Sequence, residues 1–334
     1  MKSLKVPRLC QWDITDRCNL HCKMCRNYST KTKQSDIWKI LCQKIIESGV
    51  DECSLAGGEP LMHINFRKIV EYLSPLLKKV NVLTNGTLID RETATFLYSH
   101  NCFVQISIDG GNSRTHDNIR GTGNFSKTLS GIANLRDAGV EFATQLTITT
   151  FNHEEIKEFV QLSKKLGSSS VNLRRCIPVG HGKETPVLNS NSLKKVYKTA
   201  FEFGKKFGIE ILTNEFFASL YYLSDTKAFE IERISKNKDT ILGGCSVGWT
   251  AFYVRWDGSV MFCPYLPVKC GNILEQDFEE IWEKSKMYKI SRNLRWNIVG
   301  KCSQCNYLMV CGGCPAATYN ITGDILNSDP QCWI

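Results

Sequence analysis

Short apolar runs rich in β-branched residues recur along the first two-thirds of the chain, and segments with helical periodicity separate them. The runs predict six strands, at residues 9–14, 51–55, 80–83, 103–108, 142–149 and 170–175. Six strand–helix repeats indicate an α/β fold with a parallel sheet wound with helices, either open or curled into a partial (β/α)6, TIM-like barrel. In such folds the functional side chains collect at the carboxyl ends of the strands.

The segments between the strands carry apolar residues on one helical face. The first stripe comprises Ile37, Ile40, Leu41 and Ile45, and similar stripes cover residues 66–77 and 193–207. Another helix is predicted to begin at Asn152, with Glu155 placed as in a capping box, and to end at Gly167.

From about residue 240 the helical periodicity largely gives way to cysteines, glycines and short β-like pieces, with one helix expected near 276–289. A boundary between 215 and 240 would then separate two parts of the chain. We expect a core domain at residues 1–220 and a smaller cysteine-rich domain at residues 221–334.

Composition describes an ordinary soluble globular protein, with 42% hydrophobic and 22% charged residues. No stretch approaches the roughly 18 apolar residues of a membrane span, and charges interrupt the first seventeen residues where a signal peptide would be apolar. The net charge of +9 is scattered, without the aromatic and basic signature of a nucleic-acid site. We therefore expect a cytoplasmic protein with neither a membrane nor a nucleic acid as partner.

The sixteen cysteines are the most informative feature of the composition. The cytosol keeps thiols reduced, so metal binding is the natural alternative to disulfides. Three cysteines lie within residues 18–25, and eight lie between Cys245 and Cys332. The remaining five stand singly in apolar segments and are predicted to be buried small hydrophobes: Cys10, Cys42, Cys53, Cys102 and Cys176.

The first group, Cys18, Cys22 and Cys25, has CxxxCxxC spacing directly after the first predicted strand. Thiolates this close on one loop can converge on a single soft metal centre. Three thiolates leave one iron of a four-iron cluster without a protein ligand, where a cofactor or substrate could bind. The alternative is a zinc site with His21 as the fourth ligand.

This loop resembles the cluster loop of the radical S-adenosylmethionine (SAM) superfamily. The resemblance implies that SAM chelates the open iron of a 4Fe–4S cluster and is reductively cleaved to a 5′-deoxyadenosyl radical that abstracts hydrogen from the substrate. Further segments match the family in order. Gly57-Gly58-Glu59-Pro60, after the second strand, resembles the motif that holds the SAM amino group, with Glu59 as the acceptor.

Thr84-Asn85-Gly86 follows the third strand, as in many relatives. The fourth strand ends in Ser107-Ile108-Asp109-Gly110, followed by HDNIRG at 116–121. By the resemblance, Ser107 and Arg120 bind the SAM carboxylate, and Asp109 either contacts SAM or organises the loop. Arg174 and Arg175 come after the sixth strand, where relatives often have SAM-facing or substrate-facing groups.

The C-terminal cysteines begin with Cys245, Gly258 and Cys263 in a C-x12-G-x4-C pattern, continue with a C-x2-C-x5-C-x2-C run over residues 302–314, and end at Cys332. This order resembles the SPASM domain, which in relatives carries two auxiliary 4Fe–4S clusters, and most of all the branch of quinone-cofactor, mycofactocin and heme-pathway enzymes.

The family's interleaved pattern implies a ligand set for each auxiliary cluster. The first set is Cys245, Cys263 and Cys314, and the second set is Cys302, Cys305, Cys311 and Cys332. The first set lacks a fourth cysteine, so either Cys270 completes it or its open iron binds substrate. A zinc ribbon built from the two CxxC pairs is the alternative.

SPASM proteins commonly crosslink or epimerise ribosomally made peptides, and others modify a sulfatase or a tetrapyrrole. Pro264 follows Cys263 where the sulfatase-activating group has Asp, which disfavours that group. Only seventeen residues precede Cys18, too few for an N-terminal peptide-recognition domain, so a peptide substrate would need a separate carrier protein or direct groove binding.

We therefore expect a radical SAM enzyme that matures a peptide or protein and receives electrons from a donor such as flavodoxin or ferredoxin. The alternative substrate is a tetrapyrrole of the heme pathway or another small molecule. The alternative of another class is a non-catalytic iron–sulfur electron carrier.

Overall fold

The computed structural model describes residues 6–27, 36–221 and 243–334. Within these ranges, ten strands form one sheet in the order β10-β9-β8-β1-β2-β3-β4-β5-β6-β7. The strands from β1 to β7 are neighbours in parallel: Leu9–Thr15, Glu52–Gly57, Lys79–Thr84, Phe103–Ser107, Phe142–Ile148, Ser170–Arg175 and Glu210–Thr213. All six predicted strands are confirmed, and β7 adds a seventh.

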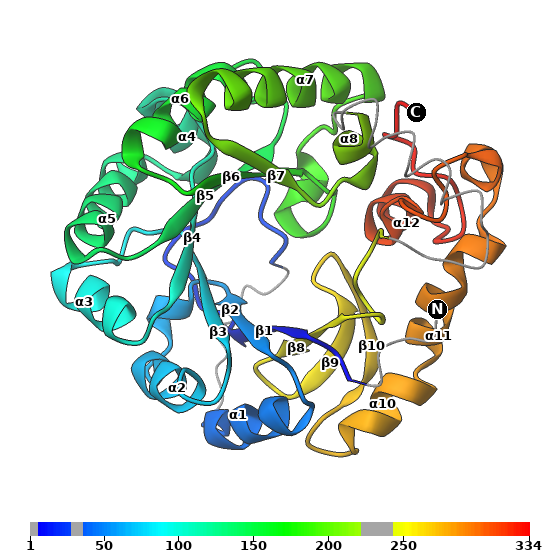
Figure 1. Cartoon of the computed structure of the whole chain (residues 1–334), viewed down its shortest axis with the longest axis horizontal. Coiled ribbons are helices and arrows are strands. Elements are labelled where there is room, and N and C mark those ends of the chain that lie inside the picture. The colour runs from blue at the N-terminus through cyan, green and yellow to red at the C-terminus, as the bar shows by residue number, and fades with distance from the viewer. Residues whose placement is uncertain (1–5, 28–35, 222–242) are drawn as a thin grey trace.

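The helices lie outside the curled sheet, as Figure 1 shows for α1 to α7. Their bounds, from α1 to α8, are Trp38–Glu47, Phe66–Leu73, Arg91–Ser99, Ser113–Arg120, Asn124–Ala138, Ile156–Leu166, Ser190–Phe207 and Phe216–Tyr221. Short 3-10 turns lie at Pro60–Met62 (η1) and Gly180–Glu184 (η2). None of the helices in the described ranges is both long enough and apolar enough to span a bilayer.

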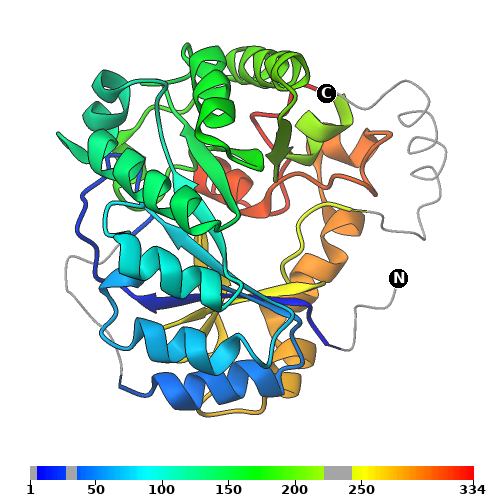
Figure 2. The ribbon, with the colours of Figure 1, turned by 60° about the vertical axis from the view of Figure 1, so that its left-hand side comes forward.

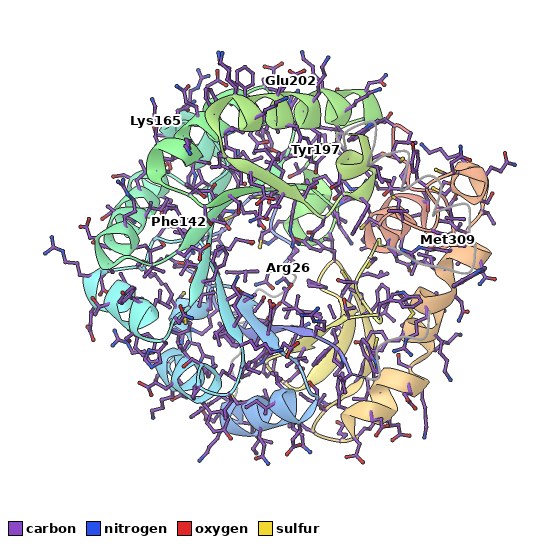
Figure 3. All side chains as sticks on the ribbon, viewed as in Figure 1. Arg26, Phe142, Lys165, Tyr197, Glu202 and Met309 are labelled. Carbon is purple, nitrogen blue, oxygen red and sulfur yellow. The ribbon has the colours of Figure 1, made fainter. Side chains whose placement is uncertain are left out.

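Strand residues alternate between the helices and the interior of the barrel. On β4, Val104 and Ile106 are fully buried beneath the helices, whereas Gln105 and Ser107 line the interior. Figure 3 shows the same division at the scale of the molecule, because Arg26 points to the centre of the ring and Lys165 points away from it. The barrel interior is therefore polar and can hold a ligand.

Two expectations about helices are corrected. Helix α6 begins at Ile156 rather than Asn152, because the Asn152 side chain closes a turn by accepting the Thr149 N–H at 2.8 Å. On α1, Ile40 is 51% exposed, and the buried face is formed by Leu41, Cys42 and Ile45.

The C-terminal segment extends the same sheet. Strand β8 (Ala251–Arg255) pairs in parallel with β1, and β9 (Ser259–Cys263) and β10 (Leu266–Asn272) follow antiparallel. Helices α10 (Phe278–Lys284), α11 (Lys286–Asn297) and α12 (Pro315–Thr322), with the turn η3 (Gly300–Gln304), fill the side between β7 and β10 (Figures 1 and 2).

The one helix expected near 276–289 is instead two, because the backbone of Ser285 is extended (ψ 126°) between α10 and α11. The predicted domain boundary at residues 220 and 221 adjoins residues 222–242, which lie outside the described ranges, and it stays a prediction.

Candidate functional site

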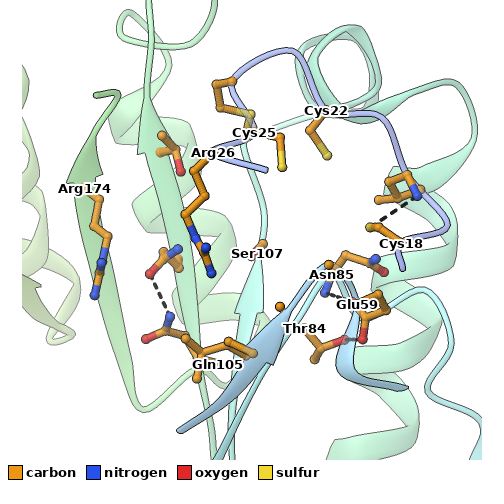
Figure 4. Close-up of a pocket in the computed structure, with 18 of the residues that line it drawn as sticks. Cys18, Cys22, Cys25, Arg26, Glu59, Thr84, Asn85, Gln105, Ser107 and Arg174 are labelled. Carbon is orange, nitrogen blue, oxygen red and sulfur yellow. Dashed lines mark hydrogen bonds between the residues drawn. The ribbon is translucent and has the colours of Figure 1, made fainter. Parts of the chain in front are cut away.

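The carboxyl ends of the parallel strands surround a cavity of about 170 Å³. Cys18, Cys22 and Cys25 line it from the loop after β1, as Figure 4 shows. Other predicted site residues in its wall are Gly57, Gly58, Glu59, Ser107 and Arg120. The structure thus brings together residues from the loop after β1, the end of β2, the end of β4 and the end of α4 that are up to about a hundred positions apart. His21 is exposed and takes no part in the lining, which argues against the zinc alternative.

The cysteine sulfurs in this loop are surrounded by donors. The backbone N–H two residues further along donates to the sulfurs of Cys18 and Cys25, at 3.4 Å in both cases. Arg120 Nη1 lies 3.9 Å from the sulfur of Cys22. Burial raises the pKa of Cys22 to about 11 even though the Arg120 guanidinium opposes this shift. A thiolate is therefore poorly stable here unless a metal neutralises it.

The glycine pair after β2 is required by a close approach of the backbone. A Cβ atom at Gly57 would collide with the carbonyl oxygen of Thr15, and one at Gly58 would collide with that of Arg17. Gly57 also has a φ of +134°. This packing lets the N–H groups of Gly58 and Glu59 donate to Thr15 O and Arg17 O at 2.8 and 2.7 Å. The glycines therefore fix the start of the cysteine loop against the end of β2.

Glu59 is 1% exposed and its carboxylate is held by three donors. Oε1 accepts the Thr84 hydroxyl at 2.7 Å and the Leu61 N–H at 3.2 Å, and Oε2 accepts the Asn85 N–H at 2.8 Å. Burial raises the pKa of Glu59, while these hydrogen bonds oppose the shift. A carboxylate has about four acceptor sites, so one remains open on Oε2. Residues 84–86 thus orient Glu59, a role that the sequence did not reveal.

Asp109 lies behind the cavity wall. It is fully buried, accepts Arg120 Nε at 2.5 Å and accepts the Thr147 N–H at 2.7 Å. Asn152 Nδ2 donates to the Asp109 carbonyl at 3.1 Å. This arrangement supports the loop-organising alternative for Asp109, which positions Arg120, while the guanidinium itself faces the cavity.

Arg26 is a cavity residue that sequence reasoning missed. Its guanidinium donates to both oxygens of Asp13, at 2.8 and 2.9 Å, and lies 5.8 and 6.0 Å from the ring centres of Tyr253 and Tyr265. Figure 4 shows it projecting into the cavity beside Cys25. The available signal was Asp13 within an apolar strand, since a buried carboxylate requires a cationic or hydrogen-bonding partner.

A second cavity, of about 370 Å³, is lined by Cys245, Cys263 and Cys314. This cavity adjoins the first cavity. Five residues line both cavities: Gln11, Arg174, Arg175, Ile177 and Tyr265. The first predicted auxiliary ligand set and the predicted SAM site therefore face each other across a common wall.

A third cavity, of about 20 Å³, is lined by the other predicted set, Cys302, Cys305, Cys311 and Cys332. Gly312 and Gly313 have φ values of +69° and +67°, and they turn the chain so that Cys311 and Cys314 line different cavities. A zinc ribbon would bring both CxxC pairs to one point, so this division disfavours that alternative.

Cys270 lies on β10, apart from these cavities. Its sulfur donates to the Val268 carbonyl at 3.8 Å, and it is absent from the linings of the second and third cavities. The structure thus places Cys270 away from Cys245, Cys263 and Cys314.

The hydrogen bonds of the cysteines distinguish five of the candidate ligands from ordinary thiols. Five candidate ligands accept a backbone N–H from the residue two positions on: Cys18, Cys25, Cys263, Cys305 and Cys311. By contrast, the sulfurs of Cys102 and Cys176 donate to carbonyl oxygens, and so does the sulfur of the candidate ligand Cys332. Hydrogen bonds of the first kind stabilise metal-bound thiolates. The five cysteines predicted to be small hydrophobes are all buried.

Arg295 supplies an independent test of whether anionic clusters fit the C-terminal cavities. It is 5% exposed, its Nη2 donates to the carbonyls of Gly243 and Cys311, and its Nε is buried without a hydrogen-bond partner. It has no carboxylate partner among the described residues, and its nearby groups of opposite charge are Cys245 and Cys311. Metal-bound thiolates at these cysteines would provide the counter-charge that a buried guanidinium needs. The residues present therefore fit the implied clusters.

Arg175 joins the barrel to the C-terminal segment. Its guanidinium contacts Asp329 through Nη1 at 2.8 Å and Nη2 at 2.5 Å, and its Nε lies 3.0 Å from Glu215. Asp329 also accepts the N–H of Cys314 at 3.1 Å. Arg174, its neighbour, lines both the first and the second cavity.

Comparison with known proteins agrees with this geometry. The family model of the radical SAM superfamily matches residues 12–166, and that of the SPASM iron-sulfur cluster-binding domain matches residues 245–306. The chain is 33% identical to the AdoMet-dependent heme synthase of Methanosarcina barkeri, over 98% of this chain and 96% of that protein. It is 28% identical to the mycofactocin maturase MftC of Mycobacterium tuberculosis, over 99% of this chain and 84% of that protein.

Among solved structures, Streptococcus suis SuiB bound to S-adenosylmethionine superimposes with a TM-score of 0.80 at 18% identity, over 99% of this chain and 78% of SuiB. This agreement concerns the fold. Together with the full-length relatives, it confirms the expected α/β fold, the enzyme class, and 4Fe–4S clusters and SAM as cofactors. The chain belongs to the radical SAM superfamily and carries a C-terminal SPASM domain.

Proposed function

We propose that this enzyme carries out a SAM-dependent radical reaction on a tetrapyrrole. The proposal takes the substrate class from the relatives named AdoMet-dependent heme synthase. The observation that carries the proposal is the common wall between the first and second cavities, which gives a substrate access to both predicted cluster sites. Heme synthase relatives match the chain over nearly its full length and theirs, at 33% and 30% identity. This similarity moves the tetrapyrrole ahead of the peptide, the substrate that sequence reasoning placed first.

In this proposal the first cavity holds the SAM site. Cys18, Cys22 and Cys25 would bind a 4Fe–4S cluster, which with SAM supplies a carbon radical that abstracts hydrogen from the substrate. The open acceptor site of Glu59 suits the SAM ammonium group. Arg120 is fixed by Asp109 next to Cys22, and it suits the SAM carboxylate together with Ser107.

The second cavity would hold an auxiliary cluster on Cys245, Cys263 and Cys314. The position of Cys270 on β10, away from this cavity, favours a cluster with one iron free of cysteine. The third cavity would hold a cluster with the four ligands that line it. These clusters would exchange electrons with an external donor such as flavodoxin or ferredoxin.

Peptide modification is the second candidate function. It is favoured by the match to the mycofactocin maturase along 99% of this chain, and by the 26% identity over 92% of this chain to the subtilosin biosynthesis protein AlbA of Bacillus subtilis. A peptide substrate would enter the same pair of cavities, either alone or delivered by a separate carrier protein.

The test is anaerobic reconstitution with iron and sulfide, followed by iron counting and a SAM-cleavage assay with a strong reductant. Three 4Fe–4S clusters predict about twelve irons per chain. Cys22→Ala is expected to abolish 5′-deoxyadenosine formation, and the matched control Cys102→Ala, at a buried site outside the cavities, should retain it. Cleavage at the parent rate in Cys22→Ala would disprove the assignment of the first cluster.

The substrate class is tested with the same preparation. Tetrapyrrole carboxylic acids and candidate peptides are incubated with enzyme, SAM and reductant, and the products are identified by mass spectrometry. A mass change in the tetrapyrrole that requires SAM supports the proposal. A change confined to a peptide would establish the second candidate. If neither the parent enzyme nor Cys22→Ala cleaves SAM, the result would favour a non-catalytic electron carrier.

A further inference from the structure

Four arginines reach the first cavity, and three of them are neutralised by a carboxylate within the protein. These three pairs are Arg26 with Asp13, Arg120 with Asp109, and Arg175 with Asp329. Arg174 has no hydrogen bond or ion pair with any residue in the described ranges. The N–H donors of its guanidinium are therefore available to a group bound in the cavity.

Arg174 occupies the wall that the first and second cavities share. Figure 4 shows it on β6, across the cavity from Cys18 and Cys22, with Arg26 projecting between them. Arg120 lies on the opposite side, 3.9 Å from the Cys22 sulfur. Arg120, which lies beside the cysteine loop, is therefore suited to bind SAM. Arg174 is suited to bind a group further from that loop.

The charge balance indicates a monoanion. Glu215 also lines the second cavity and is paired with Arg175 at 3.0 Å, so this region already contains a negative charge close to Arg174. Because Asp329 and Glu215 together balance the charges of Arg174 and Arg175, a carboxylate would add one negative charge to this region, whereas a phosphate dianion would add two. The planar fork of arginine binds a carboxylate through two parallel hydrogen bonds.

We infer that Arg174 binds a carboxylate of the substrate and thereby fixes which part of the substrate faces the cluster loop. This inference rests on the proposed tetrapyrrole function, because a tetrapyrrole of the heme type carries propionate side chains. Arg174 is thus a specificity-determining residue of the combined cavity, distinct from the SAM contacts at Glu59, Ser107 and Arg120.

The experiment measures equilibrium binding of mesoporphyrin IX, which has two propionates, and of its uncharged diamide to the reconstituted enzyme, by the change in porphyrin absorbance. A charge-assisted contact contributes about 1.5–3 kcal/mol. Arg174→Gln should therefore weaken binding of the dicarboxylic acid about 10–100-fold and leave diamide binding unchanged. Arg174→Lys should restore part of the loss. Arg91→Gln, at an exposed position on α3, is the matched control and should change neither.

Three results would overturn the inference. Equal losses for acid and diamide would show that Arg174 acts through shape rather than charge. A loss of SAM binding in Arg174→Gln, with porphyrin binding intact, would assign Arg174 to SAM. A changed iron content or altered electron paramagnetic resonance of the auxiliary clusters would assign it to a cluster. Failure of the proposed function looks different: the parent enzyme, although able to cleave SAM, would bind neither porphyrin.

Discussion

The buried ion pair between Arg175 and Asp329 should hold the C-terminal segment against the barrel. Both side chains are almost completely buried, at 1% and 0% exposure, and they are separated by 154 positions in the chain. The Asp329 carboxylate accepts the Cys314 N–H as well as two N–H groups of Arg175. We predict that Asp329→Asn destabilises the protein and loosens the position of Cys314.

The magnitude follows from what the substitution leaves behind. Glu215 would remain 3.0 Å from Arg175, but the asparagine NH2 group would face N–H donors of Arg175 or Cys314. Because Glu215 still compensates the charge of Arg175, the cost is that of a buried donor left without its acceptor, about 1–3 kcal/mol. With about 2 °C of Tm per kcal/mol for a chain of this size, the expected decrease is roughly 2–6 °C.

Thermal unfolding of the anaerobic holoprotein measures this effect, and iron release to a chelator reports on the clusters. The matched control is Glu92→Gln, which removes an ion pair with Arg67 of similar length, 2.7 Å, at exposed positions. Such a surface pair contributes about 0–1 kcal/mol, so Tm should fall by no more than about 2 °C. Equal decreases of Tm in Asp329→Asn and Glu92→Gln would refute the argument that burial makes the Arg175–Asp329 pair more stabilising than a surface ion pair.

Three further predictions test the site residue by residue. Gly58→Ala should reduce SAM cleavage about 100-fold, because its Cβ would displace the backbone before Cys18. Gly208→Ala carries the backbone cost of a positive φ (+63°) but has no atom within 4 Å of the new Cβ, so it should retain cleavage. Cys314→Ser should lower the iron content by about four per chain, and Cys270→Ser should not change it. Burial, together with the Arg120 charge, lowers the pKa of His116 to about 3. Because the folded protein then binds fewer protons than the unfolded chain below pH 6.5, the free energy of unfolding should fall by about 1.4 kcal/mol between pH 7.5 and 5.5. Chemical denaturation at the two pH values should show a smaller decrease in His116→Gln, and an equal decrease would exclude His116 as the source.

Local pattern was sufficient for the elements that position the site. The six strands and the burial of Cys10, Cys42 and Cys53 follow from apolar periodicity, which is a property of neighbouring residues. The cysteine spacing predicts the cluster loop, and resemblance to a family implies how the C-terminal cysteines divide. No local pattern predicts the turn at Gly312 and Gly313 that places Cys311 and Cys314 in different cavities.

Contacts between distant segments escaped prediction for a physical reason. Arg174 and Arg175 are adjacent and chemically identical, so no local rule assigns one to a ligand and the other to the structure. The distinction comes from Asp329, which neutralises Arg175 after the C-terminal segment has folded against β6. Only the folded arrangement shows that Arg174, which makes no hydrogen bond or ion pair within the described residues, lines both the first and the second cavity.

The same reasoning changes the expected relation between the two parts of the chain. The C-terminal hairpin supplies β8, which pairs with the outer edge of β1, an edge that would otherwise expose unpaired backbone groups. It also supplies Arg255 and Trp256, which donate to Asp16 at 2.8 Å, two residues before Cys18. The start of the first cluster loop is therefore held by residues of the C-terminal segment. A cysteine-rich segment that completes the sheet and fixes this loop is part of the proposed SAM site, since without it neither the edge of β1 nor the carboxylate of Asp16 would have these partners.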